Sequence, residues 1–311
     1  MGRQAEGARR LGIGLPVFNG ERYLGAAIES ILAQDFRDFD LVICDNASTD
    51  ATEAIAREFV RRDERVRYLR NAENLGAARN YNLAVEACGG EFFKWAAHDD
   101  LLEPSFLRRC VERLDAEPGA VLAYPRTRIV DERGQKIETY ELKLPTDDPD
   151  PVVRFEALLS IHRCFEIFGV IRRRALLETR LMEPFAHGDG ILLAHLALRG
   201  TFVEIEEELF FARRHAEQSM ERFKQDYLRY AAWFDPRHEG RRLFPYWRIY
   251  REYFRAARRA PLSLRDRWRC YRCVARWMRY RRDRLCGELR FHASDILRGI
   301  FGRRRSPQGA S

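Results

Sequence analysis

The first 116 residues alternate four times between a short apolar segment and a segment with apolar residues at helical spacing. The apolar segments lie at 11–17, 39–45, 65–69 and 91–97, and the helical patterns follow them at 21–34, 51–62, 74–87 and after Pro104. Only short links separate these segments. Strands that alternate with helices across short links pair in parallel, so the pattern predicts a doubly wound α/β sheet flanked by helices.

The section from 117 to 218 has a less regular pattern. We expect strands at 120–129, 165–171 and 201–205, a hairpin-like turn at 131–134, and helices at 152–163 and 191–198. Asp147, Asp148 and Asp150 alternate with prolines, which favours a solvated loop over a second metal site. The glutamates at 204 and 206–208 indicate a solvated strand edge.

Charge divides the chain near residue 220. Residues 221–311 carry 25 Lys and Arg against 9 Asp and Glu, a net charge of +16, whereas residues 1–220 carry 30 against 38, a net charge of −8. We therefore predict a catalytic-type domain over 1–220 and a basic, aromatic-rich helical extension over 221–311. For residues 221–305 three interpretations stay open: a helical subdomain with a solvated basic surface, a contact with an anionic membrane surface, and nucleic-acid binding. The last is least favoured because no recognised nucleic-acid module accompanies the charge.

Hydropathy and cysteine usage indicate the compartment. No segment approaches the ~18 apolar residues that span a bilayer, and residues 1–6 lack the apolar core of a signal peptide. The seven cysteines are an odd number scattered among expected helices and strands, which favours reduced thiols. Cys270 and Cys273 form a lone C-x-x-C that we interpret as structural. We predict a cytoplasmic protein and leave open a peripheral association with the inner face of the cell membrane.

The fourth expected strand ends in His98, Asp99 and Asp100. Ligands of an open α/β sheet bind at the carboxyl ends of its strands, which is where these side chains would lie. Two adjacent carboxylates repel each other unless a cation, a shared proton or water relieves them. Oxygen ligands of this kind suit Mg2+ or Mn2+, metals that usually also bind substrate phosphates. An isolated Asp-Asp pair more often caps a helix, but the residues that follow the other strands favour the metal site.

Polar and aromatic residues also follow the first three strands. They are Pro16, Phe18 and Asn19 after the first, Asp45, Asn46, Ser48 and Asp50 after the second, and Asn71, Asn74, Gly76, Arg79 and Asn80 after the third. An aromatic ring to stack on a base, a carboxylate to accept from a base N–H, an arginine and a metal-binding pair together suit a nucleoside diphosphate. Gly12 and Gly14 suggest a dinucleotide fingerprint, but Pro16 and Phe18 break its G-x-G-x-x-G spacing.

Four segments resemble, in order, the motifs of the family 2 glycosyltransferases, which have the GT-A nucleotide-sugar fold. They are Pro16-Val17-Phe18-Asn19, residues 45–50 (DNASTD), residues 74–80 (NLGAARN) and His98-Asp99-Asp100. The resemblance covers residues 11–216. It implies an inverting, metal-dependent enzyme that moves a sugar from a nucleoside-diphosphate sugar to an acceptor hydroxyl in surface polysaccharide or glycolipid biosynthesis. The acceptor would be a saccharide or a lipid-linked molecule, and the metal Mg2+ or Mn2+.

The resemblance also implies roles for individual residues. In that family the first loop and the strand-two aspartate hold the nucleobase. The implied nucleotide-binding set is Pro16, Phe18, Asn19, Asp45, Asn74, Arg79 and His98. The family's Asp-x-Asp motif maps its last carboxylate to Asp99, while Ala97 stands where the first is expected. The implied metal set is Asp99, Asp100 and His215, and a role for Asp100 in binding the sugar stays open.

Asp189 is the predicted catalytic base. On its own, an aspartate at a helix start indicates an N-cap. The resemblance implies the base because an apolar helix, a glycine, a strand and an Arg-x-His-like end follow it, here residues 213–215. The family often has a Glu-Asp pair, whereas this chain has Gly188-Asp189. His187 is a weaker competitor, and Arg213 and His215 are expected to approach the diphosphate.

Two other functions fit parts of the sequence. A non-catalytic glycosyltransferase-like scaffold, tethered to membrane or nucleic acid by the basic extension, is favoured by Ala97 and by the single carboxylate at Asp189. A nucleotidyltransferase would need a Gly-rich loop with Arg or Lys after the first strand, and residues 16–20 lack one. Metal-dependent donor hydrolysis separates the enzyme from the scaffold. We expect acceptor specificity to reside in residues 120–171.

Overall fold

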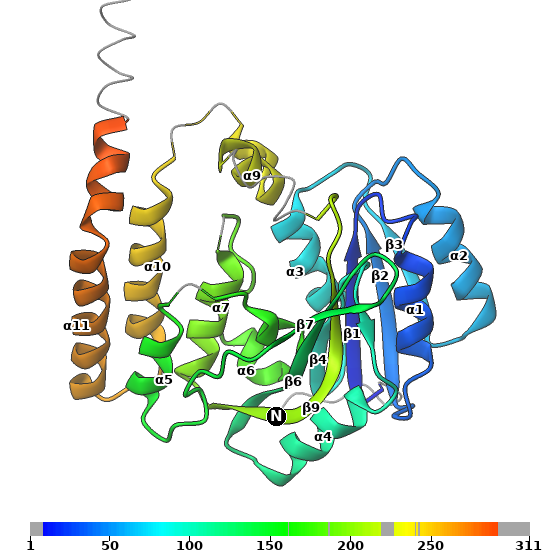
Figure 1. The fold of residues 1–311 in the computed structure, drawn as a ribbon, viewed down its shortest axis with the longest axis horizontal. Coiled ribbons are helices and arrows are strands. Elements are labelled where there is room, and N and C mark those ends of the chain that lie inside the picture. The colour runs from blue at the N-terminus through cyan, green and yellow to red at the C-terminus, as the bar shows by residue number, and fades with distance from the viewer. Residues whose placement is uncertain are drawn as a thin grey trace, which may run out of the picture.

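The computed structural model describes residues 9–160, 162–185, 187–218, 227–239, 241 and 243–291. These residues form one mixed sheet of nine strands with helices on both faces (Figure 1). The strand order is β3-β2-β1-β4-β8-β6-β9-β5, and β7 pairs with β6.

The first four strands are parallel and follow the predicted alternation. They are β1 (Leu11–Val17), β2 (Phe39–Asp45), β3 (Val66–Arg70) and β4 (Phe92–Trp95). The helices of this half are α1 (Leu24–Leu32), α2 (Thr52–Arg62), α3 (Ala77–Ala87) and, after the two-residue β5 (Leu101–Leu102), α4 (Phe106–Ala116). Strand β1 pairs in parallel with β2 and β4, and β2 pairs in parallel with β3. The prediction of a doubly wound α/β half is confirmed.

The rest of the sheet contains antiparallel pairs, which the sequence pattern does not predict. Its strands are β6 (Ala120–Val130), β7 (Lys136–Tyr140), β8 (Val170–Arg172) and β9 (Thr201–Arg213). Its helices are α5 (Pro151–Ala157), α6 (Arg173–Leu177) and α7 (Gly188–Ala197). Strand β8 is antiparallel to β4 and β6, β5 is antiparallel to β9, and β6 is parallel to β9. The expected hairpin turn joins β6 to β7, where the Gly134 N–H donates to the Asp131 carbonyl at 3.0 Å.

Three predicted element boundaries are wrong. Residues 165–168 form a 3-10 helix, η1 (Phe165–Phe168), because the preceding Cys164 has a left-handed φ of 54° and Phe165 packs against the rings of Tyr140 and Phe210. The helix predicted over 152–163 ends at Ala157. The strand predicted to end at 205 continues to Arg213 because β6 pairs beside it as far as Val130.

Two hydrophobic clusters fill the two faces of the sheet. Ile43 belongs to the cluster under α1 and α4, whereas its neighbour Cys44 belongs to the cluster under α3 and α7. Gly14 allows α3 to pack closely on β1, since a Cβ at this position would lie 2.6 Å from the Ala84 Cβ. The glycines of β1 therefore serve the packing of α3 on the sheet.

The C-terminal helices share the cluster under α7. They are α9 (Tyr227–Phe234), the 3-10 helix η2 (Pro236–His238), α10 (Pro245–Arg259) and α11 (Leu264–Tyr280). Helix α10 packs on α7 and α11, and α11 packs on α5 (Figure 1). Asp150, predicted to be solvated, caps α5 and forms an ion pair with Arg269 of α11 at 2.5 Å. The boundary predicted near residue 220 lies outside the described residues, and the division into two domains stays a prediction.

The described ranges contain no helix that combines the length and the apolar character needed to cross a membrane. All seven cysteines are free thiols. Cys270 and Cys273 are buried on α11, where the Cys273 thiol donates to Glu156 Oε2 at 3.3 Å. Their burial agrees with the prediction that these two cysteines have a structural role.

Candidate functional site

The loops after β1 and β2 are joined through Asn19. Its backbone N–H donates to Ser48 Oγ at 2.9 Å, and its Oδ1 accepts from the Thr49 N–H at 2.8 Å. Asn19 has a left-handed φ of 53°, a conformation in which asparagine is enriched. Pro16 lies within β1 beside Cys44, and the Phe18 side chain is exposed at the strand end. The first loop therefore presents an aromatic ring from a fixed backbone.

Asp45 ends β2 with a fully buried side chain. Its Oδ1 accepts from the Ser48 N–H at 2.8 Å, and its Oδ2 accepts from the Tyr68 hydroxyl at 2.5 Å and from the Arg70 guanidinium at 2.7 Å. Arg70 is the register partner of Asp45 on β3. Both oxygens are bonded to described residues, so the buried carboxylate ties the loop after β2 to the end of β3.

Asparagines link the end of β2 to the loop before α3. Asn46 Nδ2 donates to Asn74 Oδ1 at 2.8 Å, and Asn71 Nδ2 donates to Asn46 Oδ1 and Asn80 Oδ1 at 3.0 Å each. This network fixes the exposed Asn74. Arg79 instead forms an exposed ion pair with Glu86 at 2.6 Å, also on α3.

Helix α9 and η2 cover the start of α3. Gly76, which precedes α3, has a φ of 83°, and a Cβ there would lie 2.6 Å from the Phe234 carbonyl oxygen. The C-terminal part of the chain therefore contacts the loop that carries Asn74. Only a glycine allows this contact, because the left-handed backbone and the close carbonyl both exclude a side chain.

Asp99 and Asp100 meet the end of β9. His215 Nε2 lies 2.9 Å from Asp99 Oδ2. The Arg213 backbone N–H donates to Asp100 Oδ1 at 2.9 Å, and the Arg213 Nε–H donates to the Asp99 carbonyl at 2.9 Å. Of the predicted metal set, His215 thus contacts Asp99, whereas Asp100 bonds to the backbone of Arg213. Among the described residues these three do not form a closed set of ligand atoms, and the predicted metal site stays a prediction. His98 lies beside them and packs against Gly20 in the first loop.

Arg213 is buried behind this carboxylate pair. Its guanidinium donates to the Glu132 carbonyl at 2.7 Å and lies 4.9 Å from the centroid of the Tyr23 ring. The His215 ring contacts the same tyrosine, with centroids 4.7 Å apart. Arg213 therefore positions the Asp99–Asp100 turn from within the protein, which differs from the expected approach to a diphosphate.

The surroundings separate the pKa values of the two carboxylates. Burial raises the pKa of Asp100 well above its ordinary value, and the adjacent charge of Asp99 adds to the rise. Burial acts in the same direction on Asp99, but the charge of His98 and the hydrogen bond from His215 outweigh it and lower the pKa of Asp99. Within the described residues, His215 Nδ1 is buried without a hydrogen-bond partner. Carboxylate oxygens and an imidazole nitrogen are ligand types that suit Mg2+ or Mn2+, and Asp99 and Asp100 are partly exposed.

Asp189 lies in the first turn of α7, on the same side of the molecule as the metal set. Tyr81 of α3 connects the two: burial raises the pKa of its phenol, and the charges of Asp99, Asp100 and Asp189 raise that pKa further. The Asp189 Oδ1 accepts from the Gly190 N–H at 2.8 Å.

The loop before α7 is also bonded to α3. Asn82 Nδ2 donates to the Met182 carbonyl at 2.9 Å, and the Met182 N–H donates to Asn82 Oδ1 at 2.9 Å. Such a two-way amide bond fixes both partners. Helix α3 therefore holds the loop at Met182, which precedes α7.

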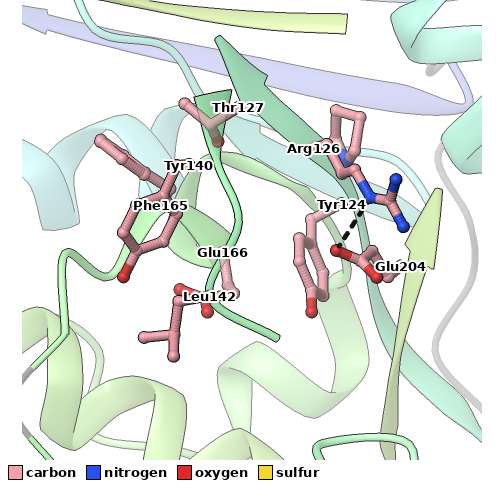
Figure 2. Close-up of a pocket in the computed structure, with 9 residues that line it drawn as sticks. Tyr124, Arg126, Thr127, Tyr140, Leu142, Phe165, Glu166 and Glu204 are labelled. Carbon is pink, nitrogen blue, oxygen red and sulfur yellow. Dashed lines mark ion pairs between the residues drawn. The ribbon is translucent and has the colours of Figure 1, made fainter. Parts of the chain in front are cut away.

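A small pocket with a volume of about 10 Å³, roughly that of one water molecule, opens between β6, β7 and η1 (Figure 2). Figure 2 shows the rings of Tyr124 and Tyr140 on opposite sides of it, with Glu166 between them. Arg126 and Glu204 form an ion pair at its rim with a separation of 3.7 Å. Burial raises the pKa of Glu166, and the charge of Asp189 contributes to the rise. The charge of Asp189 therefore contributes to the raised pKa of a carboxyl group that lines the pocket.

Comparison with known proteins decides the family. The family description "Glycosyl transferase family 2" matches residues 13–179, which is more than half of the chain. The chain belongs to glycosyltransferase family 2. The chondroitin synthase of Escherichia coli is 31% identical over 123 residues, which cover 40% of this chain and 18% of that protein. The family 2 chain thus spans much less than two thirds of the curated relatives it matches.

Solved structures show the GT-A-like fold of this family 2 chain. S. aureus TarS 1–349 in complex with UDP-GlcNAc superposes with a TM-score of 0.61 at 16% identity, over 84% of this chain and 70% of that one. The mannosyltransferase PcManGT from Pyrobaculum calidifontis, in complex with GDP-Man and Mn2+, superposes with a TM-score of 0.51 at 16% identity, over 94% of this chain and 81% of that one. At 16% sequence identity, both structural similarities show the fold alone.

Three residues of the site were not among those predicted for this family 2 chain. Arg70 and Tyr68 bond to Asp45, and the parallel register of β2 and β3 is the signal that would have indicated Arg70. Tyr23, just before α1, contacts both Arg213 and His215. Its contact with residues almost 200 positions away has no local sequence signal.

Proposed function

We propose that this chain is an inverting, divalent-metal-dependent glycosyltransferase that moves a sugar from a nucleoside-diphosphate sugar to an acceptor hydroxyl. The carboxylates that follow β4 carry the proposal: Asp99 Oδ2 lies 2.9 Å from His215 Nε2, and Asp100 Oδ1 accepts from the Arg213 N–H, while Asp189 lies in the first turn of α7. A metal-binding set and a base are needed on opposite sides of a reacting sugar, and this arrangement supplies both.

The nucleoside would lie over the ends of β1 and β2. The exposed Phe18 ring is available to stack on a base. The Asp45 carboxylate is fully buried and would reach a base N–H only after the residues that cover it move. Arg70 and Tyr68 hold the Asp45 carboxylate in place. Pro16, Asn19, Asn74 and His98 shape the surrounding loops, and Arg79 would act only after leaving Glu86.

Asp99, Asp100 and His215 would hold the metal, Mg2+ or Mn2+. When bound, a divalent cation there offsets the negative charge that develops on the leaving diphosphate. Arg213 keeps the two carboxylates directed to one side through its bonds to Asp100 Oδ1 and to the Asp99 carbonyl.

Asp189 would act as the general base. Its carboxylate takes the proton of the acceptor hydroxyl while that oxygen bonds to the anomeric carbon and the bond from this carbon to the diphosphate breaks. A single displacement of this kind inverts the anomeric centre and needs no covalent enzyme intermediate. General-base assistance is typically worth about 100- to 10,000-fold in rate.

The acceptor would be a saccharide, and the small pocket of Figure 2 would have to widen to bind a sugar ring. The rings of Tyr124 and Tyr140 offer apolar faces for a sugar ring, and Glu166 and Glu204 offer acceptors for its hydroxyls. The similarity to a chondroitin synthase supports a polysaccharide product. The exposed Leu264 and Trp268 on the arginine-rich α11 support a lipid-linked acceptor reached at an anionic membrane surface.

Asp189→Asn tests the base. With a UDP- or GDP-sugar, Mn2+ and a saccharide acceptor, we expect kcat to fall by about 100- to 10,000-fold, because the amide cannot take the proton. Donor affinity should stay within about twofold, since Asp189 is not among the residues proposed to hold the nucleotide. Asp38→Asn, an exposed carboxylate before the start of β2, is the matched control and should keep full activity. Full transfer by Asp189→Asn would remove the base assignment.

A further inference from the structure

Cys164, His187 and Asp189 form a second cluster of potential metal ligands. A thiol, a ring nitrogen and a carboxylate oxygen of these residues all lie within 4.8 Å of one another. Cys164 precedes η1, His187 precedes α7 and Asp189 is in the first turn of α7. The Cys164 side chain is buried, and the other two are partly exposed, which leaves an approach for an ion.

The chemistry of these ligands differs from that of the Asp99 site. Sulfur and imidazole nitrogen together with one carboxylate are the ligands of Zn2+, whereas Mg2+ and Mn2+ prefer oxygen. In a tetrahedral zinc site neighbouring ligand atoms lie roughly 3.3–3.8 Å apart, given metal–ligand distances of about 2.0–2.3 Å. Closing the present cluster around an ion therefore needs side-chain movements of about 1 Å or less.

A hydrogen-bond chain orients His187 from behind. Its Nε2 lies 2.9 Å from the Tyr253 hydroxyl of α10, and that hydroxyl donates to the Leu158 carbonyl at 3.4 Å. Because the Tyr253 hydroxyl donates to the Leu158 carbonyl, its oxygen is left to accept a hydrogen bond from the Nε2–H of His187. Nδ1 then carries the lone pair that a metal requires. Metal-binding histidines are usually held in this way through their other ring nitrogen.

Glu166, a further carboxyl group whose pKa is raised by burial, lies next to the cluster, and its Oε2 faces His162 Nε2 at 3.7 Å. Glu166 is buried, and within the described residues its Oε2 has no hydrogen-bond partner. The negative charge of Asp189 contributes to the raised pKa of Glu166. Cys164 and His187 also have left-handed φ values of 54° and 70°, which few residues other than glycine adopt. Such strained positions concentrate at ligand-binding sites.

We propose that Cys164, His187 and Asp189 bind Zn2+, and that the bound ion inhibits sugar transfer by occupying the catalytic base. The inhibition rests on the proposed function, because Asp189 is the base of that reaction. The zinc site itself does not depend on it. The fourth coordination position of the ion would be open to water or to the acceptor hydroxyl.

Cobalt substitution tests the site without any assay of activity. Co2+ bound to a thiolate gives a thiolate-to-metal charge-transfer absorption, which Co2+ at the oxygen and nitrogen ligands of Asp99 and His215 cannot give. We expect this band on adding Co2+ to the metal-free full chain, and its loss on adding one equivalent of Zn2+. Cys164→Ser should abolish the band, and Cys286→Ser, which changes the exposed cysteine of the helical extension, should keep it.

The absence of the band in the unchanged protein, or its survival in Cys164→Ser, would overturn the zinc site. Thermal unfolding shows whether Cys164→Ser is folded. If it is not, His187→Gln replaces it, and the band should then weaken with at least about a tenfold loss in cobalt affinity.

Transfer kinetics test the inhibition. At saturating Mn2+, Zn2+ should inhibit the unchanged protein and Cys286→Ser alike, and Cys164→Ser should need at least about tenfold more Zn2+ for the same inhibition. A cobalt band without zinc inhibition would overturn the inhibitory role and keep the site. If no donor and acceptor pair gave transfer, the proposed function would fail, and the cobalt experiment would still decide the site.

Discussion

A lysine is buried in the middle of β4, close to the predicted metal site. Lys94 has no exposed surface, its ammonium donates to the Phe168 carbonyl, and its Nζ lies 4.2 Å from the centroid of the Phe106 ring. Burial lowers the pKa of Lys94 from 10.5 to about 7. Burying a charge disfavours the protonated form, so folding below pH 7 costs the free energy of placing an ammonium in the core.

This cost makes stability depend on pH with a defined sign. The unfolded chain keeps Lys94 protonated up to about pH 10.5, whereas the folded chain releases the proton near pH 7. The unfolded state binds more protons between these values, so stability rises with pH across that window. Below pH 7 the penalty is present in full, and above pH 10.5 it disappears.

Lys94→Met should therefore stabilise the protein most at low pH. We expect the free energy of unfolding to rise by about 1–3 kcal/mol at pH 6, because an apolar side chain of similar length removes the buried charge. Urea unfolding at pH 6 and pH 10 measures the effect. An equal change at both pH values would contradict the assignment of the penalty to Lys94. Lys136→Met, which changes a partly exposed lysine paired with Glu208, serves as the control.

At the scale of elements, local patterns predicted the parallel half of the sheet and missed the rest for a physical reason. Strands β1 to β4 and helices α1 to α3 follow from local patterns, because the strands are short apolar runs that pair with close neighbours and the helices have apolar residues at helical spacing. Strand β8 and the second half of β9 depend on pairing with β4 and β6, which lie far away in the sequence. A short apolar run such as 165–171 cannot reveal such a partner.

In the site, too, local sequence patterns predicted some positions, whereas contacts between distant segments were missed. The residues after β1, β2 and β4 were predictable because parallel strands end at one edge of a sheet. Tyr23 against Arg213, Tyr253 against His187 and α9 against Gly76 are contacts between distant segments, and no local pattern indicates them. The predicted roles of the site residues stay predictions.

Gly76→Ala tests whether α9 forms part of the nucleotide-binding end. The new Cβ would meet the Phe234 carbonyl at 2.6 Å on a backbone with a φ of 83°. We expect a loss of about 1–3 kcal/mol in the free energy of unfolding and weaker nucleotide binding. Gly119→Ala, where a Cβ meets nothing within 4 Å, should change neither quantity. Unchanged stability and nucleotide affinity in Gly76→Ala would mean that α9 does not rest on α3 in solution.

At the scale of the whole molecule, the C-terminal helices are built into the core and still present exposed apolar side chains. Tyr253 and Val274 lie in the cluster under α7, whereas Leu264 is 74% and Trp268 is 68% exposed on α11. Apolar side chains on an arginine-rich helix are typical of contact with an anionic bilayer surface. We therefore interpret α11 as a membrane-facing helix that is held on the catalytic core by α5 and α10.

Vesicle sedimentation tests this interpretation. The full chain should bind vesicles that contain anionic lipid more strongly than neutral ones, and salt should weaken the binding. Changing both Leu264 and Trp268 to Ala should lower the affinity at least about tenfold, since each buried apolar side chain contributes about 1.5–3 kcal/mol. Leu177→Ala, on the exposed face of α6, should have no effect. Equal binding to neutral vesicles, or no effect of the double change, would contradict a membrane role for α11.

The most direct test of the central claim is the stability of the full chain with UDP, GDP, dTDP and their sugars, with and without Mn2+. A ligand at 100 times its Kd stabilises the folded protein by about 2.7 kcal/mol, so one nucleotide should raise Tm by several degrees, and only with the metal. We expect Asp99→Asn to lose this shift and Asp38→Asn to keep it. A shift that does not need Mn2+ or survives Asp99→Asn, or the absence of a shift with every nucleotide, would contradict a metal-dependent nucleotide-sugar site at the end of β4.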